Sequence, residues 1–228
     1  MLDGISFTAA PGTTTAIIGS TGSGKSTLLN LLPRFLDATS GEVMIGGHNV
    51  RSLPLHFLRD SLSVVPQRAY LFSGTVAGNL RIGAPEASDE DLFRALRTAQ
   101  AEDFVRDLPY GLDTAVTQGG TNFSGGQRQR LCIARALLRE APVYLFDDSL
   151  SALDYTTDAR LRQALAPLVR RSTVIIVAER IATIVDAGLI LVLDNGRLVS
   201  QGTHNELMRS SPVYQEIAAS QLALGGQL

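Results

Sequence analysis

The residues with the clearest chemical pattern form a short loop rich in glycine and serine. The phosphate-binding pattern G-x-x-x-x-G-K-[ST] is matched at every fixed position by Gly19-Ser20-Thr21-Gly22-Ser23-Gly24-Lys25-Ser26-Thr27. Glycines let backbone N–H groups curl around phosphates, and the N-terminus of a helix favours negative charge. In such a loop Lys25 can reach the β- and γ-phosphates of a nucleotide, and the Ser26 hydroxyl can bind Mg²⁺. The pattern therefore predicts a site for nucleotide phosphates.

The residues on either side of the loop fit this interpretation. Residues 14–18 are typical of a buried strand, and residues 27–32 are typical of a helix that Pro33 ends. Lys25 is also the only lysine among the 20 basic residues of the chain. A compact ammonium thus occurs only where a phosphate can be met as a point charge, whereas every other basic position is arginine. A glycine-rich turn with a surface lysine would leave the flanking strand and helix unexplained.

A second candidate element is an apolar strand that ends in two carboxylates. Residues 143–146 are followed directly by Asp147 and Asp148. In a doubly wound sheet the carboxyl ends of the strands face the ligand crevice, so both carboxylates are expected beside the phosphate-binding loop. We predict that Asp147 holds Mg²⁺ through its water shell, the Walker B role. An ordinary strand-to-helix turn is the alternative, but a phosphate-binding loop already requires such an acidic partner.

Bulk composition restricts the class of protein. The chain has 228 residues, a formal net charge of −2 and a single cysteine, Cys132. This length suits one large α/β domain, and the lack of a basic surplus argues against nucleic acid as a partner. One cysteine allows no intrachain disulfide. The longest apolar runs are too short to cross a bilayer and no signal peptide is visible, so the sequence predicts a cytosolic location.

The order of the expected elements favours an α/β fold with a mostly parallel sheet. Strands are expected at residues 2–7, 14–18, 63–65, 143–146, 173–178 and 189–193, and a strand with a tight turn at residues 41–47. Helical stretches separate the later strands, as parallel βαβ units require. Ser88 is expected to cap a helix that ends near Ala99. We predict a core of residues 1–73 and 141–228 with a small antiparallel β part, and an inserted helical subdomain at residues 74–140.

Further motifs occur in a fixed order along nearly the whole chain, and they resemble those of the nucleotide-binding domains of ATP-binding cassette (ABC) transporters. Val65-Pro66-Gln67 resembles the Q-loop of that family, and Ser151-Ala152-Leu153-Asp154 resembles its D-loop. Phe123-Ser124-Gly125-Gly126-Gln127-Arg128-Gln129-Arg130 is similar to the family signature. Residues 71–76 and 202–207 resemble the exporter branch, which includes multidrug and lipid exporters. The resemblance implies a P-loop NTPase core of the RecA-like type.

The resemblance also implies roles for these residues. ATP and Mg²⁺ are the expected ligands, and Gln67 is expected to contact the metal and to take part in hydrolysis. The run Ser124-Gly125-Gly126-Gln127 is expected to bind the γ-phosphate of an ATP molecule held by a second domain, and Asp154 is expected to contribute to the nucleotide site. Ser124 and Gln127 also have capping-box spacing, but two glycines at a helix start are unfavourable unless bare N–H groups must meet an anion.

Two catalytic positions depart from the family pattern. Where the family has a glutamate that polarises the attacking water, this chain has Asp148, whose carboxylate is withdrawn by one C–C bond of about 1.5 Å. Where the family has a histidine that donates a hydrogen bond to the γ-phosphate, this chain has Glu179, and an ionised glutamate cannot donate. We expect Glu179 to turn away, to pair with Arg180 or another cation, or to be protonated. Together these changes predict a site that holds ATP and seldom cleaves it.

An intact signature beside an impaired catalytic site suggests one half of a heterodimeric exporter. We expect a second, non-identical and hydrolysing nucleotide-binding domain as partner, together with a transmembrane domain at the cytoplasmic face of a membrane. The adenine-stacking aromatic residue and the transmembrane domain are expected upstream of residue 1. The alternatives are a soluble ABC ATPase acting on ribosomes or DNA, a fully competent homodimeric exporter domain, and a regulatory nucleotide sensor without turnover.

Overall fold

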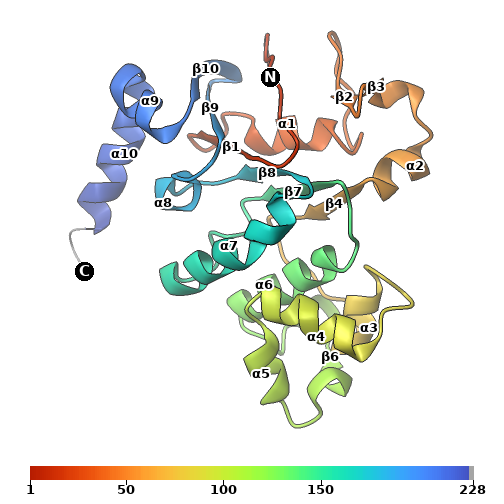
Figure 1. Cartoon of the computed structure of the whole chain (residues 1–228). Coiled ribbons are helices and arrows are strands. Elements are labelled where there is room, and N and C mark those ends of the chain that lie inside the picture. Colours follow the sequence, from red (N-terminus) through yellow and green to blue (C-terminus); the bar gives the residue numbers. More distant parts are fainter. Residues whose placement is uncertain (226–228) are drawn as a thin grey trace.

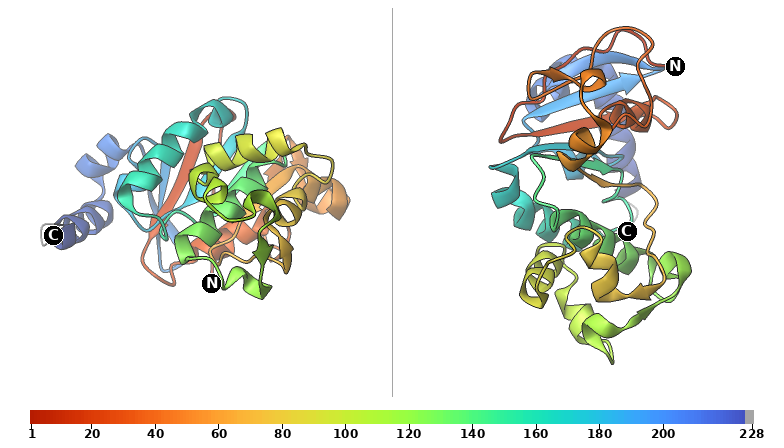
Figure 2. Two further views of the ribbon diagram at one scale, coloured as in Figure 1. Left: turned by 90° about the horizontal axis from the view of Figure 1, so that it is seen from below. Right: turned by 90° about the vertical axis from the view of Figure 1, so that its right-hand side faces the viewer.

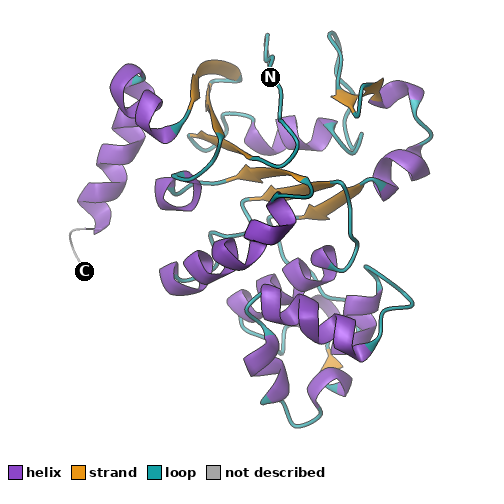
Figure 3. Ribbon diagram, in the orientation of Figure 1, coloured by secondary structure: helices purple, strands orange, loops and turns teal. Residues whose placement is uncertain are grey.

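Six strands form the central sheet of the chain, in the order β10-β9-β1-β8-β7-β4. The structure is a computed structural model that describes residues 1–225. All neighbours in the sheet pair in parallel except β10, which runs antiparallel to β9. The strands of the sheet are β1 (Thr14–Gly19), β4 (Leu62–Val65), β7 (Val143–Asp147), β8 (Thr173–Val177), β9 (Leu189–Asp194) and β10 (Arg197–Gly202). The predicted mostly parallel α/β sheet is confirmed (Figure 3).

Short strands and helices complete the fold (Figure 1). Two antiparallel pairs are formed by β2 (Met44–Ile45) with β3 (His48–Asn49) and by β5 (Gly74–Thr75) with β6 (Ala115–Val116). The α-helices are α1 (Lys25–Leu31), α2 (Leu55–Asp60), α3 (Val76–Arg81), α4 (Asp89–Thr98), α5 (Glu102–Arg106), α6 (Gly125–Leu137), α7 (Tyr155–Val169), α8 (Ile181–Ile184), α9 (His204–Ser210) and α10 (Pro212–Gly225). Single 3₁₀ turns lie at η1 (Val50–Ser52), η2 (Gly111–Asp113) and η3 (Gln118–Gly120).

Both faces of the sheet are buried, because successive side chains of a strand point to opposite sides. In β1, Ala16 and Ile18 belong to one core cluster and Ile17 belongs to the other. The first cluster includes residues of α6 and α7, and the second includes Leu28 and Leu29 of α1. Strands rich in valine and isoleucine suit this double burial. Figure 1 shows α1 on one side of the sheet and α7 on the other.

Helices α3 to α6 form a group of their own at one end of the molecule. The right-hand view of Figure 2 shows this yellow and green group projecting away from β10 and α1. Ser88 caps α4, because its hydroxyl accepts from the Asp91 N–H while the Asp91 carboxylate accepts from the Ser88 N–H. Leu92 and Leu96 of α4 are fully buried in the first core cluster. The prediction of a helix capped by Ser88 is confirmed.

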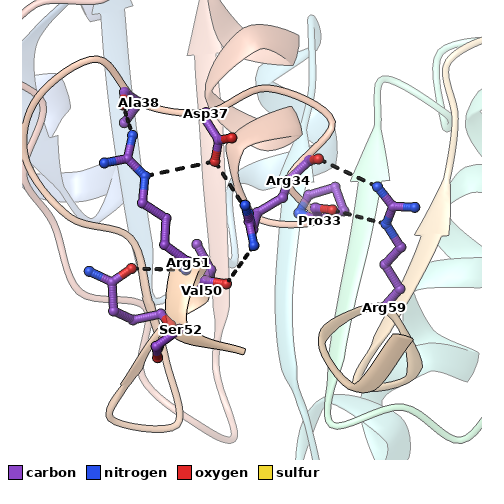
Figure 4. A network of polar contacts seen from close by, with 9 residues as sticks. Pro33, Arg34, Asp37, Ala38, Val50, Arg51, Ser52 and Arg59 are labelled. Carbon is purple, nitrogen blue, oxygen red and sulfur yellow. Dashed lines mark hydrogen bonds and ion pairs between the residues drawn. The ribbon is translucent and has the colours of Figure 1, made fainter. Parts of the chain in front are cut away.

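Arginine side chains attach the end of α1 to the segments that follow it (Figure 4). Arg34 Nε donates to Asp37 Oδ1 at 3.2 Å, and Arg51 Nε lies 3.8 Å from the same oxygen. Arg59 Nε donates to the Pro33 carbonyl at 3.3 Å. Exposed ion pairs contribute only about 0–1 kcal/mol, and the Arg59 contact provides a partner for a carbonyl just beyond the end of α1.

The prediction of a strand at residues 2–7 is wrong. Asp3 N–H donates to the Gly196 carbonyl at 2.8 Å, but no ladder of paired residues is assigned to this segment. Leu2, Ile5 and Phe7 are partly buried against the second core cluster, which explains the apolar pattern. At residues 41–47 the strand is limited to β2, and the tight turn is formed by Gly46 and Gly47 with φ of 56° and 79°.

Tyr144 provides a test of this core. Its hydroxyl accepts a hydrogen bond from the Ala141 N–H at 3.1 Å, and both residues are buried. Tyr144→Phe would leave that N–H unpaired, so we expect the free energy of unfolding, measured with urea, to fall by about 1–3 kcal/mol. Tyr110→Phe is the control, because Tyr110 is 75% exposed, and it should leave stability unchanged. Equal stability of the two variants would contradict this account of the core.

Candidate functional site

The carboxyl ends of four neighbouring strands lie at one edge of the sheet, and each strand leads into a predicted site residue. In the register, Ile17 of β1 pairs with Val177 of β8, and Asp147 of β7 pairs with the same Val177. Val65 of β4 pairs with Phe146 of β7. The phosphate-binding loop, Asp148, Glu179 and Gln67 therefore all begin at the edge where ligands bind in α/β sheets.

Glycine is required at two positions of the phosphate-binding loop. A Cβ atom on Gly19 would lie 2.1 Å from the Leu193 carbonyl oxygen, so the backbone of β9 occupies that space. Gly24 has φ of 100°, in the left-handed region, and a Cβ there would lie 2.5 Å from Leu2 Cδ2. Gly24 is also the N-cap of α1 and offers no side-chain hydrogen bond to the first turn. The first N–H groups of α1 are thus left for another acceptor.

Lys25 is a buried cation whose partners are neutral. It is 8% exposed, and its Nζ donates to the carbonyls of Gly19 at 2.8 Å and Ser20 at 2.9 Å. A buried charge is stable only when it is well paired, and carbonyl oxygens supply only partial negative charge. The Ser23 hydroxyl is buried in the same loop and has no hydrogen-bond partner among the described residues. The buried cation, the unpaired hydroxyl and the uncapped helix start fit a phosphate group.

Ser26 and Asp147 join α1 to the end of β7. Ser26 Oγ donates to Asp147 Oδ1 at 2.7 Å. Burial raises the pKa of Asp147, while the hydrogen bond from Ser26 and the charge of Lys25 oppose that rise. A hydroxyl and a carboxylate are hard oxygen donors of the kind that Mg²⁺ prefers, with its other positions filled by water and phosphate oxygens. Two of the three side chains predicted to serve Mg²⁺ therefore meet, and they fit this metal, whereas Gln67 bonds Asp148.

Asp148 lies at the same edge in a constrained position. It is 7% exposed, and its backbone has φ of 45°, in the left-handed region that few residues other than glycine adopt. Gln67 Nε2 donates to Asp148 Oδ2 at 3.3 Å, so the structure brings these two predicted catalytic residues together. Burial raises the pKa of Asp148, the charge of Glu179 raises it further, and the hydrogen bond from Gln67 opposes the rise.

Glu179 and Arg180 point to different surroundings. Glu179 is exposed, and it lines the same small pocket as Asp148. Arg180 Nη2 donates to the Ser151 carbonyl at 2.8 Å, and Nη1 donates to the Leu153 carbonyl at 3.0 Å. The guanidinium therefore binds the loop at residues 151–154 and is not the counter-ion of Glu179.

The signature residues and Asp154 form a second cluster. Ser124 and Gln127 make both hydrogen bonds of a capping box at the start of α6, and a Cβ on Gly126 would lie 3.6 Å from the Ala152 carbonyl oxygen. Asp154 caps α7 by accepting from the Thr157 N–H at 2.9 Å, and its hydrogen bonds to Thr157 lower the pKa of its carboxyl. Among the described residues, no hydrogen bond or ion pair links this cluster to the phosphate-binding loop.

One residue at the site carries no signal in the sequence. Gln221 of α10 forms hydrogen bonds with the backbone of Glu179 and of Ile181, about forty residues earlier in the chain. It lies outside every motif, and only the folded chain shows this contact.

A parallel sheet with a phosphate-binding loop after β1 and an acidic residue after β7 defines a P-loop NTPase domain. Residues 2–151 match the ABC transporter family. The chain is 50% identical over 224 residues to an uncharacterized ABC transporter ATP-binding protein of Mycobacterium tuberculosis, covering 97% of this chain and 38% of that protein. It is 43% identical over 221 residues to the ATP-dependent lipid A-core flippase of Albidiferax ferrireducens, covering 96% of this chain and 38% of the flippase.

A solved structure gives the same result. A bacterial Atm1-family ABC exporter with ATP bound superposes with a TM-score of 0.94 at 40% identity, covering 96% of this chain and 39% of that exporter. The chain belongs to the ABC transporter family and is a nucleotide-binding domain homologous to the ATP-binding parts of ABC exporters. It spans about 38% of the length of the curated relatives that it matches. No helix within residues 1–225 has both the length and the apolar character needed to cross a membrane.

Lys25→Met tests the anion site. Removing a buried charge with only carbonyl partners should raise the melting temperature without nucleotide, and it should abolish the rise on adding ATP with Mg²⁺. In the wild type a ligand at 100 times its Kd stabilises the fold by about 2.7 kcal/mol. Arg160→Met, which alters an exposed arginine of α7, is the control and should keep the full shift. An equal shift in Lys25→Met would rule out this anion site.

Asp148→Asn should stabilise the chain at neutral pH. Because the pKa of Asp148 is raised, its contribution to stability is complete below the pKa of an unfolded aspartate, about 3.9, and is lost as pH rises through the raised value. The gain in melting temperature of the variant should therefore grow across that range and then level off. Asparagine also tolerates the left-handed φ of 45° at this position.

Asp154→Asn is the control of opposite sign. The pKa of Asp154 is lowered by hydrogen bonds from Thr157, so its contribution is present above the unfolded pKa and is lost as pH falls through the lowered value. This variant should be less stable than the wild type at neutral pH and equal to it in acid. Melting curves recorded across the acid range would contradict both assignments if the two variants gave the same profile.

Proposed function

We propose that this chain is the ATP-binding subunit of an ABC exporter, that it acts by ATP-driven pairing of two such domains, and that its own site binds ATP but hydrolyses it slowly. The observation that supports slow hydrolysis is that Asp148 and Glu179, the two departures from the family pattern, line one pocket. The relatives support the first part, since one is an ATP-dependent flippase and another is an exporter with ATP bound.

Binding is assigned to the phosphate-binding loop of residues 19–27. Lys25 and the N–H groups at the start of α1 hold the phosphates, and Ser26, Asp147 and Gln67 serve Mg²⁺. When bound, Mg²⁺ neutralises phosphate charge and supplies Lewis acidity at the phosphoryl oxygens. The chain contributes a buried ammonium and two preformed oxygen donors, so little of the site must be rearranged for ATP to bind.

Slow hydrolysis is assigned to the short side chain of Asp148. A general base must lie within about 2.6–3.2 Å of the proton that it removes, and aspartate withdraws the carboxylate by about 1.5 Å relative to glutamate. Asp148 is further held by Gln67, whose amide donates to it at 3.3 Å. Loss of general-base catalysis costs about 10²–10⁴ in rate.

Glu179 weakens the same step from the other side. An ionised glutamate cannot donate a hydrogen bond to the γ-phosphate. At about 4 Å from one phosphate charge, with an effective dielectric of 20, repulsion would cost about 4 kcal/mol. The exposure of Glu179 is consistent with a side chain that avoids this position. The two departures therefore act on one chemical step and leave the binding residues intact.

The intact signature points to a partner domain. We infer that Ser124-Gly125-Gly126-Gln127 and Asp154 face the ATP of a second, non-identical domain that carries the hydrolysing glutamate and histidine. Residues 74–140 would then form the helical subdomain that presents the signature. A transmembrane domain would place the assembly at the cytoplasmic face of the membrane.

Purification of the transporter should yield a membrane subunit rather than nucleic acid, and bound nucleic acid would favour a soluble ABC ATPase instead.

Restoring the family residues tests the catalytic assignment. In the assembled transporter, Asp148→Glu with Glu179→His should raise single-turnover ATP hydrolysis at this site by about 10²–10⁴. The matched control is Asp148→Gln with Glu179→His, because glutamine has the length of glutamate and no basic carboxylate. An equal gain in the control, or no gain in the restored variant, would contradict the assignment.

The division of labour between the two domains is tested separately. Asp148→Asn in this chain should leave most of the single-turnover rate, whereas removal of the corresponding carboxylate from the partner domain should abolish it. Equal losses from the two changes would mean that both sites hydrolyse ATP, as in a fully competent exporter. No hydrolysis by the wild-type transporter would favour a regulatory nucleotide sensor.

A further inference from the structure

The side chain of Gln221, in the last helix of the chain, holds the backbone on both sides of Arg180. Its Oε1 accepts from the Ile181 N–H at 2.8 Å, and its Nε2 donates to the Glu179 carbonyl at 2.6 Å. The oxygen and the nitrogen of one side-chain amide thus each bond a backbone group of the segment that contains Glu179. We call residues 179–181 the switch segment.

Gln221 supplies a cap that the local sequence lacks. Ile181 is the first residue of α8, and the N-cap residue Arg180 makes no side-chain hydrogen bond to that helix. Helix α8 has only four residues, so its own hydrogen bonds stabilise it weakly. The free N–H of a helix start needs a partner, and here the partner comes from α10.

The start of α10 is anchored well enough to act as a fixed support. Tyr214 is fully buried, and its hydroxyl lies 2.9 Å from His204 Nδ1 of α9. Ser211 Oγ lies 2.7 Å from Ser200 Oγ of β10. The helix is therefore attached to both α9 and β10 before it reaches the switch segment.

Arg180, within the switch segment, and Thr183, two residues after it, both contact residues 151–158. Arg180 binds the carbonyls of Ser151 and Leu153, and its guanidinium lies 4.9 Å from the ring centre of Tyr155. Thr183 Oγ1 donates to Asp158 Oδ2 at 3.2 Å. The switch segment is thus held between the residue 151–158 region and α10, so its position depends on both.

We propose that Gln221 is a positioning residue that sets where the residue at position 179 lies relative to the γ-phosphate, and that α10 thereby controls the hydrolysis step. This inference rests on the proposed function, in which position 179 faces the γ-phosphate. The Gln221 side chain forms its hydrogen bonds with the backbone of residues 179 and 181 and lies outside the phosphate-binding loop, so its loss should affect the rate of hydrolysis and leave the affinity for ATP.

The structural part is tested by hydrogen exchange on the assembled transporter. Gln221→Leu should speed exchange of the Ile181 amide by about fivefold to tenfold, as expected for the loss of one hydrogen bond. Gln221→Glu keeps the acceptor and should leave that amide protected. Gln215→Leu is the matched control, because Gln215 lies on the same helix and bonds only the Met208 carbonyl. Wild-type exchange at Ile181 in Gln221→Leu would overturn the proposal.

The functional part uses the restored variant Asp148→Glu with Glu179→His, whose hydrolysis is fast enough to follow. Adding Gln221→Leu should lower its single-turnover rate about tenfold while the Kd for ATP changes less than about twofold, and adding Gln215→Leu should change neither. A rate unaffected by Gln221→Leu, or a parallel loss of ATP affinity, would overturn the positioning role. If the restored variant is no faster than wild type, the proposed function fails, whereas the exchange result still decides whether Gln221 holds the segment.

Discussion

The parallel register of β4, β7, β8 and β1 is the constraint on which the site depends. Val177 pairs with Ile17 on one side and with Asp147 on the other, so these residues of three strands lie at one level. Backbone bonds extend this alignment past the strands, since the Ala178 N–H donates to the Ile17 carbonyl and the Asp148 N–H donates to the Val177 carbonyl. A shift of one residue in any strand would turn its side chains to the other face and separate these groups.

This alignment places several electrostatically unfavourable groups at one edge of the sheet. Lys25 is buried against carbonyls, Asp147 and Asp148 have raised pKa values, and α1 begins without a side-chain cap. Each feature reduces the stability of the protein alone, and a phosphate group with Mg²⁺ would relieve those at Lys25, Asp147 and the start of α1. Active sites commonly trade stability for function in this way. Binding of ATP therefore contributes to folding stability through the same groups that recognise it.

The local motifs could be predicted from the sequence, because spacing alone fixes them. The glycine loop with Lys25, the capping box at Ser124 and the capped start of the helix after Ser88 each depend on residues that are close together in the chain. The strand predicted at residues 2–7 was wrong, since an alternating apolar pattern reports burial and does not report a hydrogen-bonded neighbour.

Contacts between distant segments could not be predicted in this way. Ser26 and Asp147 meet across 121 residues, and this pair was expected only because the order of elements places both at the same sheet edge. The contact of Gln221 with the switch segment follows from where α10 packs, which no motif encodes. The orientation of the Arg180 side chain also depends on packing. Its guanidinium bonds the carbonyls of residues 151 and 153, although the carboxylate of Glu179 is adjacent in the sequence.

The two departures from the family pattern are physically linked rather than independent. The charge of Glu179 raises the pKa of Asp148, so the second change makes the first carboxylate harder to ionise. A histidine at position 179 would have the opposite effect when charged, since a cation stabilises a neighbouring carboxylate. Only the change at position 179 adds negative charge at this edge of the sheet, because aspartate and glutamate carry the same charge at position 148. Under the proposed function, the two changes would leave the ATP-binding residues 19–27 intact and weaken the hydrolysis step, and this combination would suit a nucleotide that mainly holds two domains together.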